Sequence, residues 1–463
     1  MEDEVVNRGY LESLGSVELM AFPFYLFIIF YLSYAYQMKR IGNNPSYTYF
    51  SKGLMVKLMG ALFFCLCYIY YYQGGDTIAY FESSRSFVNL LQLRPNSFLT
   101  VYFGSNSVEN YSQFDMFTGL PFKYMYFEGR TMFVIKIIFP FVLLGFKSYL
   151  ISTILLSATS FLGIWRMYQV FVRYYPEYYK QIAIGFLFLP TAIFWGSGIL
   201  KDTITLTAFC WFVSSFEKGI ISREKIVVNV LIALLAGYII LLIKPYILMA
   251  CVPGMFAWMF HQRVAKIRNK FLKVSAMPII YALSIVLGIG IMALLGDRLD
   301  KFSLNKVLFS AKESQMDLKN DAYEGHGFDI GSYDASVQGV MGKAPIAIVS
   351  GLFRPFIWEA KNFVMLLSAL ENLAFLYLFI YPFVKIGFKK TVLILFDNPL
   401  LFFLFSYSVF FAFSIGISTS NFGALVRFKI AFAPFLATLL LILYGLKSKK
   451  KVKKINQSAY QSR

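Results

Sequence analysis

The sequence predicts an all-α, polytopic integral membrane protein with about eleven transmembrane helices. The 463 residues are 58% hydrophobic and only 15% charged, whereas a soluble domain carries roughly 25% charged residues. Apolar stretches of about 20 residues, the length that crosses a ~30 Å hydrocarbon core, recur along most of the chain. The uneven distribution of Lys and Arg then gives these segments an orientation.

We expect the spans at residues 19–36, 54–72, 148–165, 181–198, 203–216, 226–243, 246–260, 275–295, 363–384, 398–415 and 428–446. Two shorter apolar stretches, 131–146 and 344–352, are expected to form half-inserted or interfacial helices on the outer face. Two long extracytoplasmic loops are expected at 73–130 and 296–343. The predicted organisation is a single transmembrane domain, 1–446, followed by a basic cytoplasmic tail, 447–463.

The orientation follows from the basic residues. With the acidic N-terminus outside, more than half of the 44 Lys and Arg residues fall in short cytoplasmic loops and in the tail, Lys57 among them. This bias is the one that sets membrane topology, and it explains the net charge of +19 without a nucleic-acid partner. The segment Met1–Glu4 has the wrong charge for a cleavable signal peptide, so we expect the first span to be retained. The predicted orientation has the N-terminus outside and the C-terminus in the cytoplasm.

Two groups of residues carry weaker signals. The four cysteines all fall in apolar runs and are expected to be small apolar residues rather than disulfide or zinc ligands: Cys65, Cys67, Cys210 and Cys251. An acidic, glycine-containing stretch is expected to form a mobile, solvated lid: Asp317, Asp321, Glu324, His326, Asp329 and Asp334. Its spacing fits no metal motif, so no cofactor or metal is expected, although a divalent cation is left open.

Asp76 follows the second predicted span, directly after Gly74 and Gly75. A carboxylate at the membrane surface can act as a general base towards a sugar hydroxyl. The alternative is an ordinary glycine turn that ends one helix and an Asp that caps the next.

Lys201 and Asp202 lie in a tight connection between two predicted spans, after the run Trp195-Gly196-Ser197-Gly198. Glycines leave backbone N–H groups free for an anion, and a lysine there can meet a phosphate. The alternative is a turn capped by Asp202 with a snorkelling Lys201. Lys244, before Pro245, is a weaker candidate of the same kind.

Two further polar segments lie at predicted outer ends of spans. In 352–362, Arg354 and Glu359 alternate with aromatic residues such as Trp358, which fits a sugar-stacking wall with an arginine for phosphate, or a plain aromatic belt. In 418–429, Arg427 and Lys429 face the outer leaflet against the positive-inside trend, and Asn421 precedes them. Ionisable groups at membrane depth usually face a cavity or a partner. Together these cations predict a pocket for a lipid-linked pyrophosphate, because Arg binds phosphate oxygens in bidentate fashion.

The chain resembles the bacterial O-antigen and capsule repeat-unit polymerases (Wzy type) and related membrane glycosyltransferases with a GT-C-like fold. The residues that carry the resemblance lie between about 70 and 440: Gly75-Asp76-Thr77 with Tyr80, Trp195-Gly196-Ser197-Gly198 with Lys201-Asp202, Arg354-Pro355 with Trp358-Glu359, and Asn421-Phe422-Gly423 with Arg427.

The resemblance implies an enzyme of polysaccharide biosynthesis in the cell envelope, located in the bacterial inner membrane. It would transfer a glycan from undecaprenyl pyrophosphate to an incoming lipid-linked unit, in contact with membrane lipid, a chain-length regulator and a flippase. Arg427 and Arg354 would hold the donor pyrophosphate, with Lys201 and Lys244 assisting, and Asp76 would activate the acceptor. In GT-C enzymes that acid lies in the first outer loop, whereas Asp76 follows the second predicted span, so the first span would be an added helix.

Four alternatives stay open, one of which is a purely structural or assembly-partner protein that would have no cationic pocket. A transferase that uses a monosaccharide on polyprenyl phosphate needs fewer cations, and an O-antigen ligase uses a lipid core as acceptor. A transporter or lipid-linked oligosaccharide flippase would need charges along a path open to both faces. The predicted spans are almost free of charge and the cations crowd one end, which favours an enzyme.

Overall fold

The computed structural model describes residues 16–265, 279–280, 282–283, 286, 304–317, 327–361 and 363–446. These residues form helices joined by turns, with an isolated bridge between Gly327 and Asn421. The predicted span 275–295 lies almost entirely outside the described residues. The acidic segment Met1–Glu4, residues 318–326 of the acidic loop and the basic tail lie wholly outside them.

The described chain contains seven helices that are long and apolar enough to cross a membrane, or eight if one bent pair counts as a span. The seven are Met20–Ile41, Pro45–Tyr71, Tyr149–Tyr174, Lys201–Ile221, Ile226–Ile243, Met365–Lys385 and Pro399–Ser418. The bent pair, Phe422–Lys429 and Ala433–Gly445, has an angle of 65°. The polytopic membrane character predicted from the sequence is therefore confirmed, and the count of eleven spans is not.

The chain divides into two compact units, a division that the sequence did not predict. Unit 1 comprises 1–170, 192–216 and 227–244, and unit 2 comprises 171–191, 217–226 and 245–463. The boundaries fall inside helices: α9 (Tyr149–Tyr174), α11 (Pro190–Trp195) and α13 (Ile226–Ile243) each contribute residues to both units.

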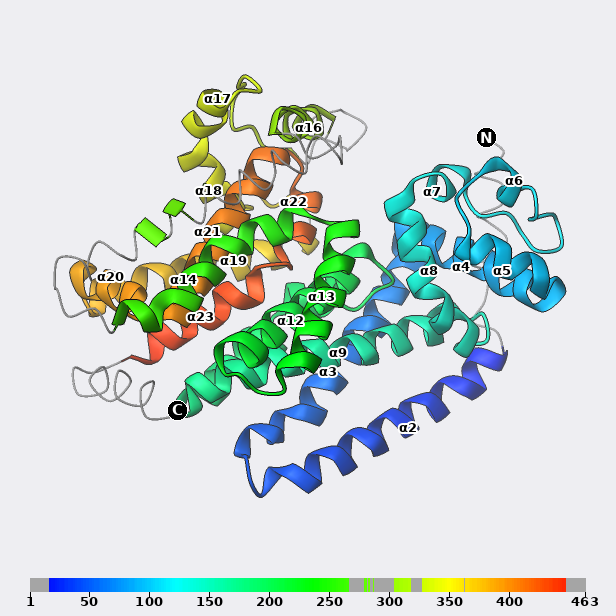
Figure 1. Ribbon diagram of the computed structural model, residues 1–463, viewed down its shortest axis with the longest axis horizontal. Helices are drawn as coiled ribbons and strands as arrows, with labels where there is room; N and C mark the ends of the chain where they lie inside the picture. Colours follow the sequence, from blue (N-terminus) through cyan, green and yellow to red (C-terminus); the bar gives the residue numbers. More distant parts are fainter. Residues whose placement is uncertain are drawn as a thin grey trace. The chain divides into compact units, whose positions relative to one another are not determined.

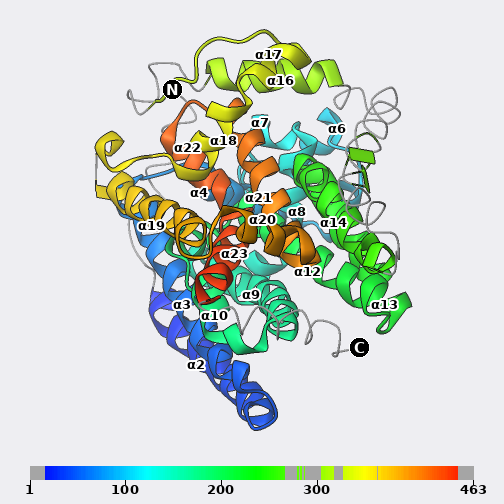
Figure 2. The same ribbon diagram turned by 90° about the vertical axis from the view of Figure 1, so that its left-hand side faces the viewer.

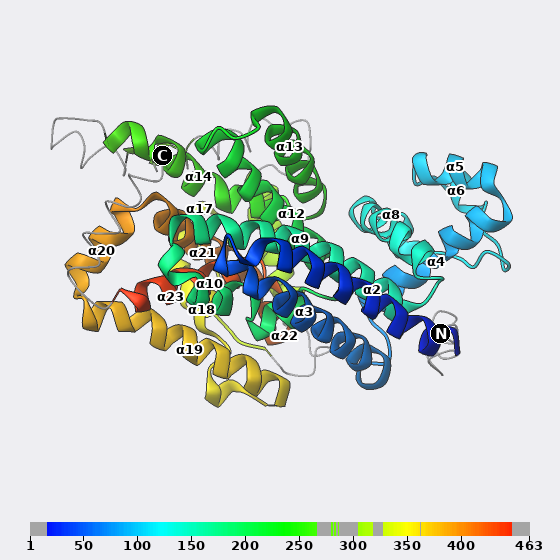
Figure 3. The same ribbon diagram turned by 90° about the horizontal axis from the view of Figure 1, so that it is seen from below.

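Unit 1 is built from α2 (Ser16–Ile41), η1 (Pro45–Thr48), α3 (Tyr49–Leu66), η2 (Cys67–Tyr71), α4 (Asp76–Leu93), α5 (Pro95–Phe103), α6 (Val108–Tyr111), α7 (Lys123–Tyr126), α8 (Gly129–Leu144), most of α9, the end of α11, α12 (Lys201–Phe216) and most of α13. The helices α4 to α8 gather at one end of the α2, α3 and α9 bundle (Figures 1 and 3). The expected extracytoplasmic loop 73–130 is thus largely helical, and the expected short helix at 131–146 is α8.

Arg40, Lys52 and Arg166 of unit 1 lie where the end of α2, the start of α3 and the last turns of α9 and α12 meet. The Tyr36 ring lies 4.6 Å from the Phe50 ring, and Trp165 lies 4.9 Å from Phe50, so the end of α2, the start of α3 and the end of α9 meet. Arg166 donates to Ser214 at 3.1 Å, near the end of α12. Lys201 begins α12 and therefore lies at its other end.

Unit 2 is built from η3 (Pro176–Tyr178), α10 (Tyr179–Leu187), η4 (Glu217–Ile221), α14 (Tyr246–Ala265), α16 (Leu304–Asp317), α17 (Val337–Gly342), α18 (Ala344–Phe353), η6 (Ile357–Glu359), α19 (Phe363–Lys385), α20 (Phe388–Asp397), α21 (Pro399–Ser418), α22 (Phe422–Lys429) and α23 (Ala433–Gly445). The helix α21 is central, since α14, α16, α18, α20 and α23 all contact it. Figure 2 shows α20 beside α21.

Small residues let α18 and α21 cross closely. A Cβ atom on Gly351 would overlap the Ala412 carbonyl, and one on Gly416 would overlap the Ala347 carbonyl. Each helix thus presents a small residue every fourth position, the pattern that allows transmembrane helices to approach at backbone distance.

The predicted span 181–198 is wrong as a continuous helix. The chain there forms α10, which ends at Leu187, and the short α11, which ends at Trp195. Pro190 cannot donate to an i−4 carbonyl and disfavours helical geometry in the residue before it. The prediction overlooked this break because hydropathy alone was continuous across it.

Candidate functional site

The predicted site residues fall into two sets, one in each unit. Unit 1 contains Asp76, Lys201, Asp202 and Lys244. Unit 2 contains Arg354, Trp358, Glu359, Asn421, Arg427 and Lys429. We describe the geometry of each set within its own unit.

Lys201 begins α12 and meets a carboxylate and a hydroxyl from the start of α8. Its Nζ donates to Thr131 Oγ1 at 2.6 Å and lies 3.4 Å from Glu128 Oε2. The ammonium also lies 5.9 Å from the centroid of the Tyr80 ring, on α4. The side chain keeps 23% of its surface exposed, so a ligand has access to this ammonium.

The sequence analysis missed Glu128 and Thr131. Glu128 caps α8, because its carboxylate accepts from the Thr131 backbone N–H at 2.7 Å. An acid three residues before a threonine at the start of an apolar run is a helix-cap pattern that could have revealed it. Partial burial raises the pKa of Glu128, but the hydrogen bonds from Thr131 and the charge of Lys201 outweigh burial and hold this pKa below its usual value.

Asp202 and Lys244 form an ion pair that joins the first turn of α12 to the end of α13. The Asp202 side chain is 2% exposed and that of Lys244 is 12% exposed. A buried carboxylate needs a compensating charge, which Lys244 supplies. Lys244 is thus engaged with protein, and its contribution to the site is to hold Asp202 and the start of α12 in place.

Asp76 begins α4 after two glycines with left-handed backbones, Gly74 with φ 152° and Gly75 with φ 98°. Glycine is favoured at such angles because it has no Cβ. Asp76 is exposed, and Tyr80 follows it by four residues, so the two side chains share one face of α4. Since Lys201 lies over Tyr80, Asp76 is on the face of α4 that meets Lys201.

Lys57 is not in a cytoplasmic loop, which corrects the expectation from the charge count. It lies within α3, is 4% exposed, and its Nζ donates to the Gly196 carbonyl and to Ser197 Oγ, the latter at 3.4 Å. These two residues belong to the turn that precedes Lys201. A lysine inside an apolar helix therefore secures the backbone break from which α12 starts.

Arg354 is the most unusual cation of unit 2. Its Nε lies 3.3 Å from Glu359 Oε1, and its guanidinium carbon lies 5.2 Å from the Phe328 ring centroid and 5.9 Å from that of Phe356. Its Nη1 is buried and has no hydrogen-bond partner among the residues that the structure describes. Trp358 stacks on Phe356 with centroids 4.8 Å apart and is 81% exposed. The Arg354 guanidinium thus has an N–H donor without a described partner, and the exposed ring of Trp358 lies in the same segment.

Lys429 holds the Arg354 segment in place. Its Nζ donates to the Leu352 carbonyl at 3.1 Å, the Arg354 carbonyl at 2.6 Å and Asn372 Oδ1 at 2.8 Å. Three protein acceptors satisfy the three donors of an ammonium. This buried side chain is therefore a support for the segment and is not presented to a ligand.

Asn421 caps α22 by accepting from the backbone N–H groups of Gly423 at 2.8 Å and Ala424 at 3.2 Å. Arg427 lies in the last turn of the same short helix and is half-buried. The structure thus assigns Asn421 a local role in shaping the helix that carries Arg427.

Residues 327–333 belong to the stretch that was expected to form a solvated lid. They pack against α21 and α22. The Phe328 N–H donates to the Ser420 carbonyl at 2.7 Å, and the Phe328 ring stacks 5.1 Å from that of Phe422. The Tyr333 hydroxyl donates to the Ile417 carbonyl at 2.9 Å. The lid expectation is wrong for these residues, because their aromatic side chains are buried.

Within the described part of the chain, no group of three or more His, Cys, Asp or Glu side chains is placed to hold a metal. The four cysteines are free thiols, which confirms that they form no disulfide, and Cys65, Cys210 and Cys251 are buried. Comparisons with protein-family models, with curated proteins and with solved structures gave no match.

Proposed function

We propose that this chain is a membrane glycosyltransferase that acts at the extracytoplasmic face on sugars linked to a polyprenyl (pyro)phosphate. Its most favoured reaction is the polymerisation of polysaccharide repeat units for an O-antigen, a capsule or an exopolysaccharide. The observation that carries the proposal is the partly exposed Lys201 ammonium at the start of α12, between the Glu128 carboxylate and the Tyr80 ring. A partly exposed cation beside a carboxylate can bind a phosphate-linked sugar, and the buried Tyr80 ring supports the lysine.

The reaction assigns roles to these groups. The acceptor hydroxyl attacks the anomeric carbon of the donor sugar, and the bond from that carbon to the pyrophosphate oxygen breaks. Asp76 takes the proton of the acceptor, since an exposed carboxylate can act as a general base. Cations stabilise the negative charge that builds on the leaving pyrophosphate. In unit 1 the candidate cation is Lys201; Arg354 and Arg427 are the cations of unit 2 that we propose as phosphate contacts, each within its own unit.

Arg354 adds independent support for an anionic ligand. A buried donor without a partner costs about 1–3 kcal/mol, so an acceptor such as a phosphate oxygen would stabilise Nη1, which has no partner among the described residues. Phosphate oxygens fit this donor, and the exposed Trp358 is placed to stack on a sugar ring.

A transporter of lipid-linked saccharides is the second candidate, and one observation favours it. Lys57 in α3 is ionisable and buried inside a candidate span, and the half-buried Glu371 in α19 accepts from the Thr191 N–H at 3.0 Å. Intramembrane ionisable groups often mark a transport path. Both residues bind backbone groups beside helix breaks, however, which is a structural use.

The test is deletion of the gene in its host, followed by gel analysis of surface and lipid-linked glycans. The proposal predicts loss of long chains with single repeat units retained on the outer face. Wild type restores the ladder, whereas Asp76→Ala, Lys201→Ala and Arg427→Ala do not, although all are present in the membrane. Lys123→Ala, an exposed lysine of the same unit as Lys201, is the matched control and restores it.

Two results contradict the proposal in different ways. If the deletion strain still makes long chains, the protein is not the polymerase, and a side-branch transferase or a ligase is favoured instead. Accumulation of lipid-linked units on the cytoplasmic side would favour the transporter.

A further inference from the structure

Two neighbouring apolar side chains of unit 1 project almost completely from the protein surface. Met116 is 95% exposed and Phe117 is 84% exposed, and both lie in the middle of the loop that joins α6 to α7. Isolated exposed apolar residues are common, but a fully exposed adjacent pair in an ordered loop is a feature of surfaces that contact something. We refer to residues 115–118 as the apolar tip.

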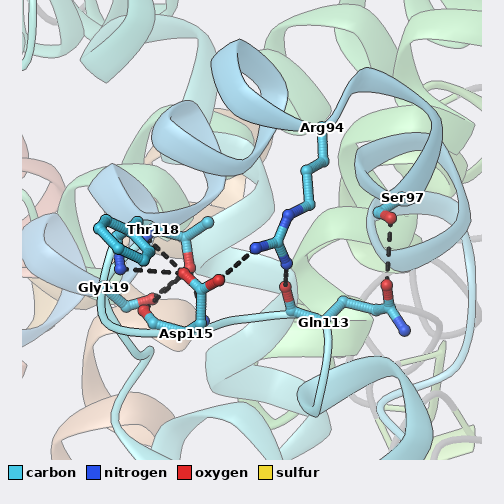
Figure 4. A network of polar contacts seen from close by, with 7 residues as sticks. Arg94, Ser97, Gln113, Asp115, Thr118 and Gly119 are labelled. Atoms are coloured by element: carbon cyan, nitrogen blue, oxygen red, sulfur yellow. Dashed lines mark hydrogen bonds and ion pairs between the residues drawn. The ribbon is translucent and has the colours of Figure 1, made fainter.

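The apolar tip is held in a fixed shape at its base. Asp115 Oδ1 accepts from the N–H groups of Phe117 at 2.9 Å and Thr118 at 3.0 Å, while the Asp115 N–H donates to Thr118 Oγ1 at 2.8 Å. Arg94 pairs with the same carboxylate and donates to the Gln113 carbonyl at 3.2 Å (Figure 4). These hydrogen bonds and the charge of Arg94 hold the pKa of Asp115 below its usual range. The loop is therefore built to present its two apolar side chains outward.

The chain on either side of the tip anchors it in the core of unit 1. Phe114 is buried and lies 5.0 Å from the Phe87 ring, and Thr118 is completely buried. Burial thus alternates sharply: Phe114 and Thr118 point inward, and Met116 and Phe117 point outward. Hydrophobicity that merely stabilised the fold would have been directed inward at all four positions.

A short hydrogen-bonded path places the base of the tip at the boundary of a membrane span. The Thr118 carbonyl accepts from Asn89 Nδ2 at 3.0 Å, and Asn89 Oδ1 accepts from Lys147 Nζ at 2.9 Å. Lys147 precedes by two residues the first residue of α9, Tyr149, where a candidate span begins. The start of α4 also meets this point, through the 2.8 Å hydrogen bond between Thr77 and Tyr149.

Both ends of α4 are therefore tied to the beginning of α9, so α4 lies across the end of this span. The loop that carries the apolar tip is supported by α4, so the base of the tip lies near Tyr149, at the level where the candidate span of α9 begins. Aromatic and basic side chains are enriched at that level, where one end of a side chain is in lipid and the other in water.

We propose that the apolar tip inserts into the lipid leaflet and anchors the α4–α8 part of unit 1 on the membrane surface. A second copy of the chain is a poorer occupant, because an aromatic side chain buries only about 150–250 Å², whereas a specific protein interface buries about 1,200 Å² or more. Two side chains on a rigid base suffice for a lipid wedge. The proposal concerns membrane contact and does not depend on the reaction assigned above.

The test uses an environment-sensitive fluorophore on cysteine in the full-length chain, reconstituted in vesicles of phosphatidylethanolamine and phosphatidylglycerol. Phe117→Cys and Met116→Cys place the label on the tip, and Glu109→Cys places it on α6, an exposed charged position of the same segment. The unsubstituted protein, carried through the same labelling, gives the background from the four native cysteines.

A tip in lipid gives blue-shifted emission at positions 116 and 117. It also gives strong quenching by a nitroxide on the lipid acyl chain and weak quenching by aqueous iodide, with the reverse at position 109. Iodide quenching at the tip as strong as at 109 would overturn the proposal, because the tip would then lie in water. Protection of the tip label from both quenchers would overturn it as well and would indicate protein as the occupant.

Discussion

The ion pair between Asp202 and Lys244 provides the sharpest test of how unit 1 is held together. Lys244→Met keeps the bulk of the side chain and removes its charge, which leaves the Asp202 carboxylate, 2% exposed, without this partner. Removing one member of a buried ion pair costs about 3–5 kcal/mol. Asp202 lies in the first turn of α12, where the helix dipole offsets roughly 0.3–1 kcal/mol. The free energy of unfolding should therefore fall by about 2–5 kcal/mol.

The assay is unfolding by sodium dodecyl sulfate in mixed micelles, followed by the fluorescence of the five tryptophans. Lys123→Met is the control, since substitutions of exposed residues away from such features change stability by less than about 0.5 kcal/mol. The double variant Asp202→Asn with Lys244→Met carries no buried charge at this pair and should recover most of the loss. Additive effects of the two single substitutions, or a loss below about 1 kcal/mol for Lys244→Met, would refute the reasoning.

Three further predictions follow from the geometry. Lys57→Met should lower the unfolding free energy in the same micelles by about 1–3 kcal/mol because it leaves a buried carbonyl unsatisfied, while Lys52→Met, exposed on the same helix, should have little effect. Gly416→Ala should cost about 1–3 kcal/mol by overpacking, whereas Gly342→Ala, with open space around it, should be neutral or better; equal effects would contradict the close helix crossing. The pKa of Glu128 is lowered on folding from 4.5, so its stabilisation is complete above about pH 4.5 and is lost as the pH falls further. The unfolding midpoints at pH 7 and pH 4 should therefore differ less in Glu128→Gln than in wild type. If the difference is the same in both proteins, the Glu128–Lys201 pair does not contribute to the pH dependence of stability.

The fold was predictable where hydrophobicity alone decides the outcome. Runs such as 226–243 have only one means of satisfying their backbone in lipid, which is a helix, and the structure has α13 at these residues. The prediction failed at 181–198 because composition does not reveal where a helix breaks. Pro190 was available in the sequence, but only packing decides whether a proline in an apolar run interrupts the helix or kinks it.

The sequence indicated candidate residues but not the partners that each of them contacts. The sequence indicated Lys201, Asp202 and Lys244, and it did not indicate that Lys244 is used by Asp202 or that Lys201 meets Glu128, more than 70 residues away in the chain. For Lys429 the sequence suggested a ligand contact, whereas its ammonium is taken by three protein acceptors. Partnerships of this kind join residues distant in sequence, so no local pattern specifies them.

The sequence by itself determined that this chain spans a membrane several times, because the hydrocarbon core requires long apolar helices and the amino-acid composition supplies them. It also indicated some ionisable residues that need a partner, such as Lys201, Asp202 and Lys429, but it placed Lys57 in a cytoplasmic loop. Only the tertiary structure decided how each charge is compensated. Lys57 and Lys429 secure backbone breaks, Asp202 is neutralised by Lys244, and Lys201 stays partly exposed beside Glu128. The physical reason is that the energy of a charge depends on the groups within a few ångströms of it, and those groups come together only when the helices pack.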